Sequence, residues 1–291
     1  MAVRPLDGIR IVDSTYIFAM PYAAGMMTDM GAEVIKVEGI QHPDRGAQGG
    51  GPDNEPGGDP WNRGATFNQL NRGKRSLTLD LSRDKGRDAL KELISISDII
   101  IENYTPRVMR GWGMGYENLK KIKPDIIMLS NTGYGHGEGP YTNYPGQATT
   151  MEASQGLSAT TGYRDGLPDK AGQSYIDFVA CWTGLFAIAS AVGGVAQNEA
   201  MLLGSRGVQG LAAALASPSA LALITTTFPP GPQRNRAFSV FAAMSGIGAA
   251  IGGHAGDATP VAQLLAAVCD TLIVHPNVVN ASDINEMPGN A

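Results

Sequence analysis

Short apolar runs and amphipathic segments take turns along the first half of the chain. Apolar or alternating runs predict strands, whereas apolar positions three to four apart predict helices. The predicted strands cover residues 9–13, 32–38, 76–81, 98–103 and 125–135, the last running into a glycine-rich loop, and the predicted helices cover 22–30 and 84–95. Because strands and helices alternate, we expect an α/β fold, a Rossmann-like open parallel sheet with flanking helices.

Polar residues and glycines gather where the predicted strands end. These positions are Asp13, Ser14, Thr15, Glu38, residues 102–104 and residues 130–135. In open parallel sheets, ligands bind beyond the carboxyl ends of the strands. The pattern therefore places a binding site at this edge of the sheet.

Residues 173–192 form an apolar run with a single charge, Asp177, near its start. The dipole and free N–H groups at the start of a helix stabilise a carboxylate as the anion. That position suits a nucleophile that must stay ionised at neutral pH. A capping role for Asp177 fits the same stretch, so both interpretations stand on these residues alone.

Composition and charge narrow the class of protein. A net charge of −5 and a pI near 5.4 argue against a nucleic-acid partner. The two cysteines give no disulfide framework, and the four scattered histidines give no metal site. The first residues lack the apolar stretch of a signal peptide. We therefore expect a cytoplasmic protein without a bound metal.

Several blocks between Pro5 and about Val192 carry a family resemblance. They read PLDGIRIVD, GAEVIKVE, NRGKRSLTLDL, DIIIENYTP, GWGMGYENL, NTGYGHGEGPY and YIDF. Their order and spacing resemble the family III CoA-transferases, a family that includes formyl-CoA and carnitine-type transferases and α-methylacyl-CoA racemase. The resemblance implies an acyl-CoA:carboxylate CoA-transferase with no permanent cofactor, a CoA thioester as substrate and a carboxylic acid as acceptor.

The same resemblance assigns the site. Asp177, in YIDF, is implied to be the nucleophile, forming an acyl anhydride and then an enzyme–CoA thioester. The implied CoA contacts are Ile17, Phe18, Ala19, Lys74, Arg75, Asn103, Tyr104 and Arg107, with Tyr134, Gly135 and His136 in a substrate loop. Lys74 and Arg75 would meet phosphates. Formyl-CoA transferases carry glutamine where this chain has Phe18, so we expect a different acyl preference.

Two rival chemistries are weaker on sequence grounds. Gln147 stands where the racemases carry a histidine, and an amide cannot exchange a proton near neutral pH. Cys181 is a second candidate nucleophile, but it lies in an apolar run without an adjacent base. Transferase is therefore favoured over an α-methylacyl-CoA racemase-like isomerase.

The resemblance stops near residue 192, and charge becomes sparse after Ala171, with nine charged residues in the rest of the chain. Residues 200–252 resemble part of a major facilitator drug-efflux transporter, and 248–290 resemble a family of unknown function. The uncharged runs 207–228 and 237–253 approach membrane-spanning length, which allows membrane contact through 207–253.

We therefore expect a composite chain of three segments. They are a truncated α/β domain over 1–192, an Ala- and Gly-rich helical hairpin over 193–252, and a small segment of unknown function over 253–291. The family dimer is expected if its assembly survives in this chain. Two alternatives follow from the missing second half: an inactive or binding-only CoA-site protein, and a membrane-associated composite protein.

Overall fold

The computed structural model describes residues 4–44, 55, 58, 60–136, 139–163, 165–172, 175–196, 199–227 and 231–239. The chain divides into two compact units, Met1–Arg234 and Asn235–Ala291. The first unit contains the sheet, the helices around it and the candidate site. Of the second unit, the structure describes residues 235–239, which are helical.

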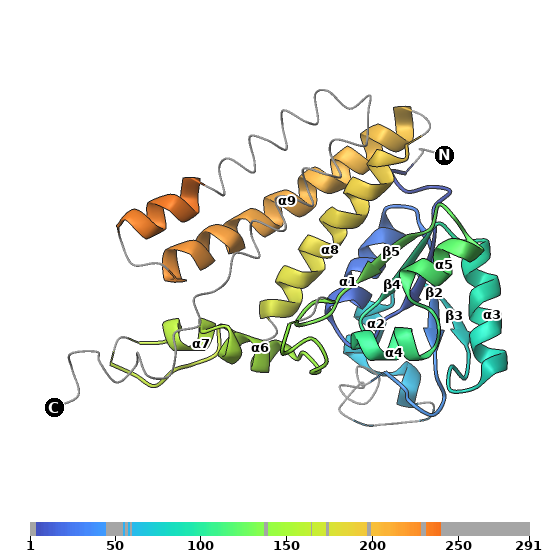
Figure 1. The fold of residues 1–291 in the computed structure, drawn as a ribbon, viewed down its shortest axis with the longest axis horizontal. Coiled ribbons are helices and arrows are strands. Elements are labelled where there is room, and N and C mark those ends of the chain that lie inside the picture. Colours follow the sequence, from blue (N-terminus) through green and yellow to red (C-terminus); the bar gives the residue numbers. More distant parts are fainter. Residues whose placement is uncertain are drawn as a thin grey trace. The chain divides into compact units, whose positions relative to one another are not determined.

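The centre of the first unit is a five-stranded parallel sheet in the order β3-β2-β1-β4-β5 (Figure 1). Its strands are β1 (Arg10–Ser14), β2 (Glu33–Glu38), β3 (Arg75–Thr78), β4 (Ile99–Glu102) and β5 (Ile127–Ser130). Parallel strands are buried on both faces, which explains their continuous apolar sequences. The predicted α/β fold with a parallel sheet is confirmed, and every predicted strand is present with ends shifted by a few residues.

Helices cover both faces of the sheet, α1 and α8 on one side and α3, α4 and α5 on the other. The described helices are α1 (Ala19–Asp29), α2 (Ala65–Leu70), α3 (Asp84–Ser95), α4 (Pro106–Gly111), α5 (Tyr116–Ile122), α6 (Ala148–Ser154), α7 (Leu157–Thr160), α8 (Tyr175–Gly194) and α9 (Glu199–Thr227), with the short 3-10 helix η3 (Pro60–Asn62). Helix α3 begins and ends as predicted. Helix α1 begins three residues before its predicted start, since Pro21 is tolerated in the first turn of a helix.

Two apolar clusters hold these layers together. On one face, Ile11, Ile99 and Ile101 pack with the buried sides of α1 and α8. On the other, Val12 and Ile100 pack with residues of α3, α4 and α5. Alternate residues of each strand thus face opposite clusters, as the period of a strand requires.

Helix α9 packs along α8 in the same compact unit, whereas the sequence predicts a separate segment from residue 193 (Figure 1). Val208 and Ala212 are buried in the cluster that contains α1 and α8. The described part of the first uncharged run therefore lies on the core. The second run, 237–253, and the predicted segment 253–291 lie outside the described residues, apart from 237–239.

Helix α8 is long and apolar enough to cross a membrane, and it is the one such helix in the part of the chain that the structure describes. One such helix is weak evidence, because the core helix of a soluble protein passes the same test. Cys181, Leu185 and Ile188 on α8 are buried against the sheet side of the unit. The buried third of its apolar window therefore packs on the core of the unit, while Phe178 and Phe186 are 37% and 38% exposed.

Candidate active site

A cavity of about 1530 Å³ lies at the carboxyl edge of the sheet. Its walls include the residues that end or follow every strand: 16–19 at β1, 37–43 at β2, 78–82 at β3, 103–105 at β4 and 131–133 at β5. Residues 144–149, Met151 and the first turns of α8 complete the described lining. This is the edge where the polar strand ends predict a ligand site.

Asp177 lies in the wall of this cavity. It is the third residue of α8 and is half-buried, so the helix fixes its position in the cavity wall. The N-terminal end of a helix favours an anion through the dipole and its free N–H groups. The residue predicted to be the nucleophile therefore lies in the wall of a ligand-sized cavity.

An aromatic group stands beside Asp177. The ring of Phe18 meets the edge of Phe178 with centroids 5.1 Å apart, and Tyr22 lies 6.0 Å from both rings. Phe18 and Ala19 line the cavity at the start of α1, as the family resemblance implies. The wall next to Asp177 is thus apolar on this side, and Phe18 supplies a side chain there as well as backbone.

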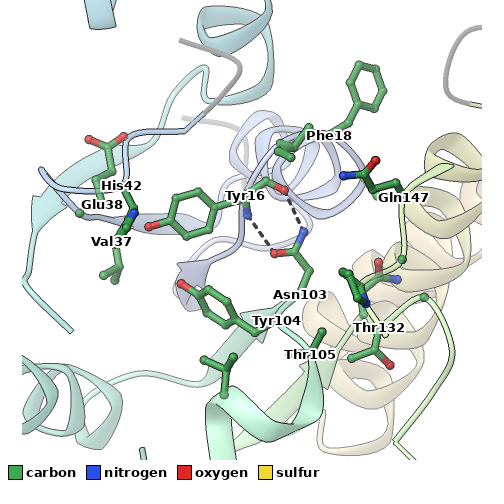
Figure 2. A pocket seen from close by; sticks show the side chains of 18 of the residues that line it. Tyr16, Phe18, Val37, Glu38, His42, Asn103, Tyr104, Thr105, Thr132 and Gln147 are labelled. Atoms are coloured by element: carbon green, nitrogen blue, oxygen red, sulfur yellow. Dashed lines mark hydrogen bonds between the residues drawn. The ribbon is translucent and has the colours of Figure 1, made fainter. Parts of the chain in front are cut away.

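Asn103 and Tyr104 also line the cavity, in its middle (Figure 2). The amide of Asn103 is turned to the backbone of Tyr16, accepting its N–H at 2.9 Å and donating to its carbonyl at 2.8 Å. The Tyr104 hydroxyl lies 3.3 Å from Ser14 Oγ, and burial raises the pKa of Tyr104. Both residues are therefore at the expected place, but their polar groups are engaged by the protein.

Lys74 lies elsewhere. Its ammonium is 1% exposed and donates to Asp13 Oδ2 at 2.7 Å, to the Pro21 carbonyl at 2.9 Å and to Asn71 Oδ1 at 2.9 Å. These three bonds use all of its donors, and Lys74 does not line the cavity. The expected phosphate contact does not agree with this burial, which gives Lys74 a structural role.

The other two expected basic contacts lie outside the cavity wall. Arg75 is the first residue of β3 and forms an exposed ion pair with Glu33, the first residue of β2, at 3.0 Å. It therefore stands toward the amino ends of these strands, away from the edge that carries the cavity. Arg107, in the first turn of α4, is exposed and near lining residues Thr105 and Val108. Of the three, Arg107 is the one whose neighbours in sequence reach the site.

The part of the glycine loop after β5 that lines the cavity is 131–133, the three residues before those expected. Gly133 lines the cavity, whereas Tyr134, Gly135 and His136 do not. The Tyr134 hydroxyl lies 3.2 Å from Ser154 Oγ. His136 Nε2 lies 3.6 Å from Oε1 of the buried Glu102, and that oxygen has no hydrogen-bond partner.

At its other end the cavity is lined by Glu38, which the strand-end pattern predicted, and by His42 and Asp80, which it did not. Figure 2 shows Glu38 and His42 on the opposite side from Phe18 and Gln147. A hydrogen bond from Ser82 lowers the pKa of Asp80. Asp80 falls inside the strand predicted over 76–81, whereas β3 ends at Thr78, and His42 lies four residues beyond the end of β2.

The charges of the wall are mainly acidic. The ionisable groups among its described residues are Glu38, Asp80, Asp177, His42 and the tyrosines, with no lysine or arginine. In the part of the chain that the structure describes, no group of three His, Cys, Asp or Glu side chains could hold a metal ion. The available chemistry is that of a carboxylate beside an apolar wall and backbone groups.

Together, the doubly covered parallel sheet and the strand-end cavity with a helix-borne carboxylate define an α/β protein with a ligand site. A sequence model of CoA-transferase family III matches residues 6–267. The chain belongs to CoA-transferase family III. The match continues past residue 192, over all of 200–252 and the first part of 248–290, and neither of the resemblances to other families is supported.

Relatives of known activity match the chain in part. The succinyl-CoA:glutarate CoA-transferase of Mus musculus is 38% identical over 199 residues, covering 68% of this chain and 43% of the relative. The succinyl-CoA–L-malate CoA-transferase beta subunit of Chloroflexus aurantiacus is 39% identical over 185 residues, covering 62% and 43%. The chain spans less than half the length of these curated relatives.

A solved structure has the same fold. The CAIB/BAIF family protein from Brucella suis is 28% identical, covers 79% of this chain and 60% of its own, and superposes with a TM-score of 0.61. The agreement extends over most of the first unit. The fold class predicted from the sequence is therefore that of the family.

Proposed function

We propose that this protein transfers CoA from an acyl-CoA to a carboxylic acid, with Asp177 as the nucleophile. The observation that carries the proposal is the position of Asp177: on the first turn of a helix that packs on the core, in the wall of a cavity lined by residues from all five strand ends. A family III CoA-transferase needs an ionised carboxylate with access to a large substrate. The family match and this position support the same residue.

The proposed chemistry balances without a resident cofactor. A carboxylate oxygen of Asp177 attacks the thioester carbonyl, the C–S bond breaks, and the CoA thiolate leaves an acyl-aspartyl anhydride. The thiolate then attacks Cγ of Asp177, which releases the donor acid and leaves an enzyme–CoA thioester. The acceptor carboxylate attacks Cγ in turn, and the thiolate returns to the acceptor's carbonyl carbon. N–H groups near the starts of α1 and α8 would stabilise the oxyanions.

CoA would lie along the strand ends. Ile17, Phe18 and Ala19 would contact it beside Asp177, and Asn103 and Tyr104 would flank it in the middle of the cavity. Among the described residues, the wall itself supplies no cation for the phosphates, so Arg107 at its rim is the candidate that we keep. Substrates for the first assays are succinyl-CoA with glutarate or malate, because the relatives named above carry these names.

The assembly and location belong to the same proposal. We expect a cytoplasmic protein that forms a homodimer if the family assembly, which the sequence resemblance implies, survives in this chain. The binding-only alternative is supported by one observation, that the chain spans less than half of its curated relatives. The isomerase alternative is weakened because Gln147, which lines the cavity, cannot act as a general acid or base at neutral pH.

The decisive experiment traps the covalent intermediate. Full-length protein is incubated with succinyl-CoA and then with hydroxylamine, which converts an anhydride or thioester on Asp177 to a hydroxamate. Peptide mass spectrometry locates the modification. We expect the hydroxamate on the peptide that contains Asp177 in the native protein and its loss in Asp177→Asn.

Two comparisons make the result unambiguous. Asp88→Asn is the matched control, since Asp88 is an exposed carboxylate on α3 paired with Lys91, outside the cavity wall. It should be labelled like the native protein. Native protein that binds CoA by calorimetry but gives no hydroxamate would contradict the proposal and favour the binding-only alternative.

A further inference from the structure

The turn that carries Ile17 has an unusual backbone. Ile17 has φ of +67°, and among the described residues it is the one non-glycine with a positive φ. Left-handed backbone is disfavoured for any residue with a Cβ and most of all for a β-branched one. Such a conformation persists when surrounding contacts hold it, and these residues often lie at functional sites. Ile17 lines the cavity, so its strain calls for an explanation in the contacts around it.

One side of the turn is held by Asn103. Its Oδ1 accepts the N–H of Tyr16 at 2.9 Å and its Nδ2 donates to the carbonyl of the same residue at 2.8 Å, as the dashed lines in Figure 2 show. This pair of bonds mimics a strand pairing, and it fixes both peptide groups of Tyr16. The amide of Asn103 is therefore directed to the turn.

The other side is held by Asp44. Both of its carboxylate oxygens accept the N–H of Ile17 at 3.1 Å, and the side chain is buried. Lys36 lies 3.5 Å from this carboxylate and also donates to the carbonyl of Thr15. A buried, charge-assisted contact is stronger than a neutral one and fixes the peptide plane before Ile17.

The consequence of the turn reaches Asp177. Residue 18 follows directly, and the ring of Phe18 meets Phe178, the neighbour of Asp177, at 5.1 Å. We propose that Asn103 and Asp44 are positioning residues that hold Ile17 in the left-handed conformation and so keep Phe18 and the start of α1 against the first turn of α8. Neither touches the reacting atoms; each acts through the 16–18 turn. The inference rests on the proposed function.

The test uses glycine to remove the strain. Glycine adopts φ near +67° without cost, so in an Ile17→Gly background the turn keeps its shape without the clamp. We expect Asn103→Ala to lower the rate of Asp177 acylation by succinyl-CoA about tenfold or more in the native background. In the Ile17→Gly background the loss should shrink to about threefold. Ile17→Val, which keeps the β-branch, is the matched background and should show the full loss.

A second variant guards against misfolding. Asn103→Asp has the same shape and still accepts from Tyr16 N–H, but it sets a carboxylate oxygen against the Tyr16 carbonyl. Asn103→Asp and Asp44→Ala should each lower the rate of Asp177 acylation as Asn103→Ala does. For each, the loss should be smaller in the Ile17→Gly background. Equal losses in the Gly and Val backgrounds would overturn the proposal, because a residue that only stabilises the fold gives no such difference.

A readout without catalysis separates this inference from the proposed function. Amide hydrogen exchange at Ile17 and a crystal structure of Asn103→Ala report the turn directly. We expect faster exchange and a relaxed φ at residue 17. An unmoved turn with positive φ refutes the clamp even if Asp177 is acylated. A relaxed turn in a protein that never acylates Asp177 refutes the transferase and leaves the clamp intact.

Discussion

Lys74 and Asp13 form a fully buried ion pair, with Nζ 2.7 Å from Oδ2 and side chains 1% and 0% exposed. Asp13 comes from the end of β1, and Lys74 comes from the residue before β3. Burial alone would raise the pKa of Asp13, but the charges of Lys74 and Lys36 outweigh it and hold that pKa below its ordinary value of 3.8. The pair therefore joins the sheet to α1, through the further bond to the Pro21 carbonyl.

We predict that Lys74→Met lowers the free energy of unfolding by about 3–5 kcal/mol at pH 7, because a buried carboxylate loses its closest cation. The contribution of a carboxylate with a lowered pKa is present above its unfolded pKa and is lost as the pH falls through the folded value. The cost should therefore shrink below pH 3.8. Urea unfolding across this range measures it.

The double variant gives the control for this pair. Asp13→Asn with Lys74→Met removes both charges, so it should lose less than the two single variants combined. Arg75→Met, which breaks an exposed pair with Glu33, should cost little. A Lys74→Met protein that is as stable as the native protein but binds CoA more weakly would contradict this prediction. That result would support the phosphate contact expected from the sequence.

Glu102 gives a second prediction, in which the pH dependence of stability runs in the opposite direction. Burial raises the pKa of this carboxyl, although bonds from Ser130 and the Tyr104 N–H act against it. A raised pKa stabilises the protein fully below the ordinary value of 4.5, and that stabilisation is lost as the pH rises through the folded value. The stability of Glu102→Gln should therefore increase relative to that of the native protein as the pH rises from about 4 to about 8.

The histidine next to Glu102 also affects how the stability depends on pH. His136 lies 3.6 Å from Glu102 Oε1 and would stabilise the anion when it is protonated. Thermal unfolding is therefore compared in a His136→Gln background, where this partner cannot titrate. If the further substitution Glu102→Gln changes the stability of that background by the same amount at every pH, the raised pKa is contradicted.

The sequence predicted what depends on local patterns. The run 98–103 became β4, Ile99–Glu102, because an uninterrupted apolar run suits a central parallel strand. The helix that carries Asp177 followed from a long apolar run headed by one charge. Strand ends located the cavity at the carboxyl edge because topology fixes which ends of parallel strands meet.

The missed contacts depend on residues far apart in the chain. A basic pair before a strand looks the same whether it faces solvent or the sheet, and the partner that buries Lys74 is Asp13, 61 positions away. The bond from Asn103 to Tyr16 spans 87 positions, and no local signal gives Ile17 a positive φ. Such contacts become visible when the strand order and register are known.

The thiol of Cys181 should be unreactive in the folded protein. It is fully buried on α8, and burial raises its pKa to about 12, so the thiolate is scarce at neutral pH. We predict no alkylation of Cys181 by iodoacetamide at about pH 8 in the folded protein and rapid alkylation in urea. Peptide mapping separates it from Cys269, which lies outside the described residues. Alkylation in the folded protein with loss of acylation would favour a cysteine nucleophile.

Two glycines bring two segments of the cavity wall into contact. A Cβ on Gly133 would lie 2.7 Å from the Cα of Gly146 and 2.8 Å from Met151 Sδ. Gly133 follows β5, and Gly146 precedes Gln147, so this backbone contact sets where the 144–147 segment borders the site. Alanine at position 133 must push that segment away, because a backbone atom cannot yield as a flexible side chain can.

We therefore predict that Gly133→Ala destabilises the protein by about 1–3 kcal/mol and slows acylation of Asp177 about tenfold or more. Gly111→Ala is the matched control, since a Cβ there meets no atom within 4 Å and its residue lies in α4. Urea unfolding and hydroxylamine trapping measure the two effects. A Gly133→Ala protein with native stability and acylation would show that the two segments can separate without cost. The position of Gln147 would then not depend on this contact.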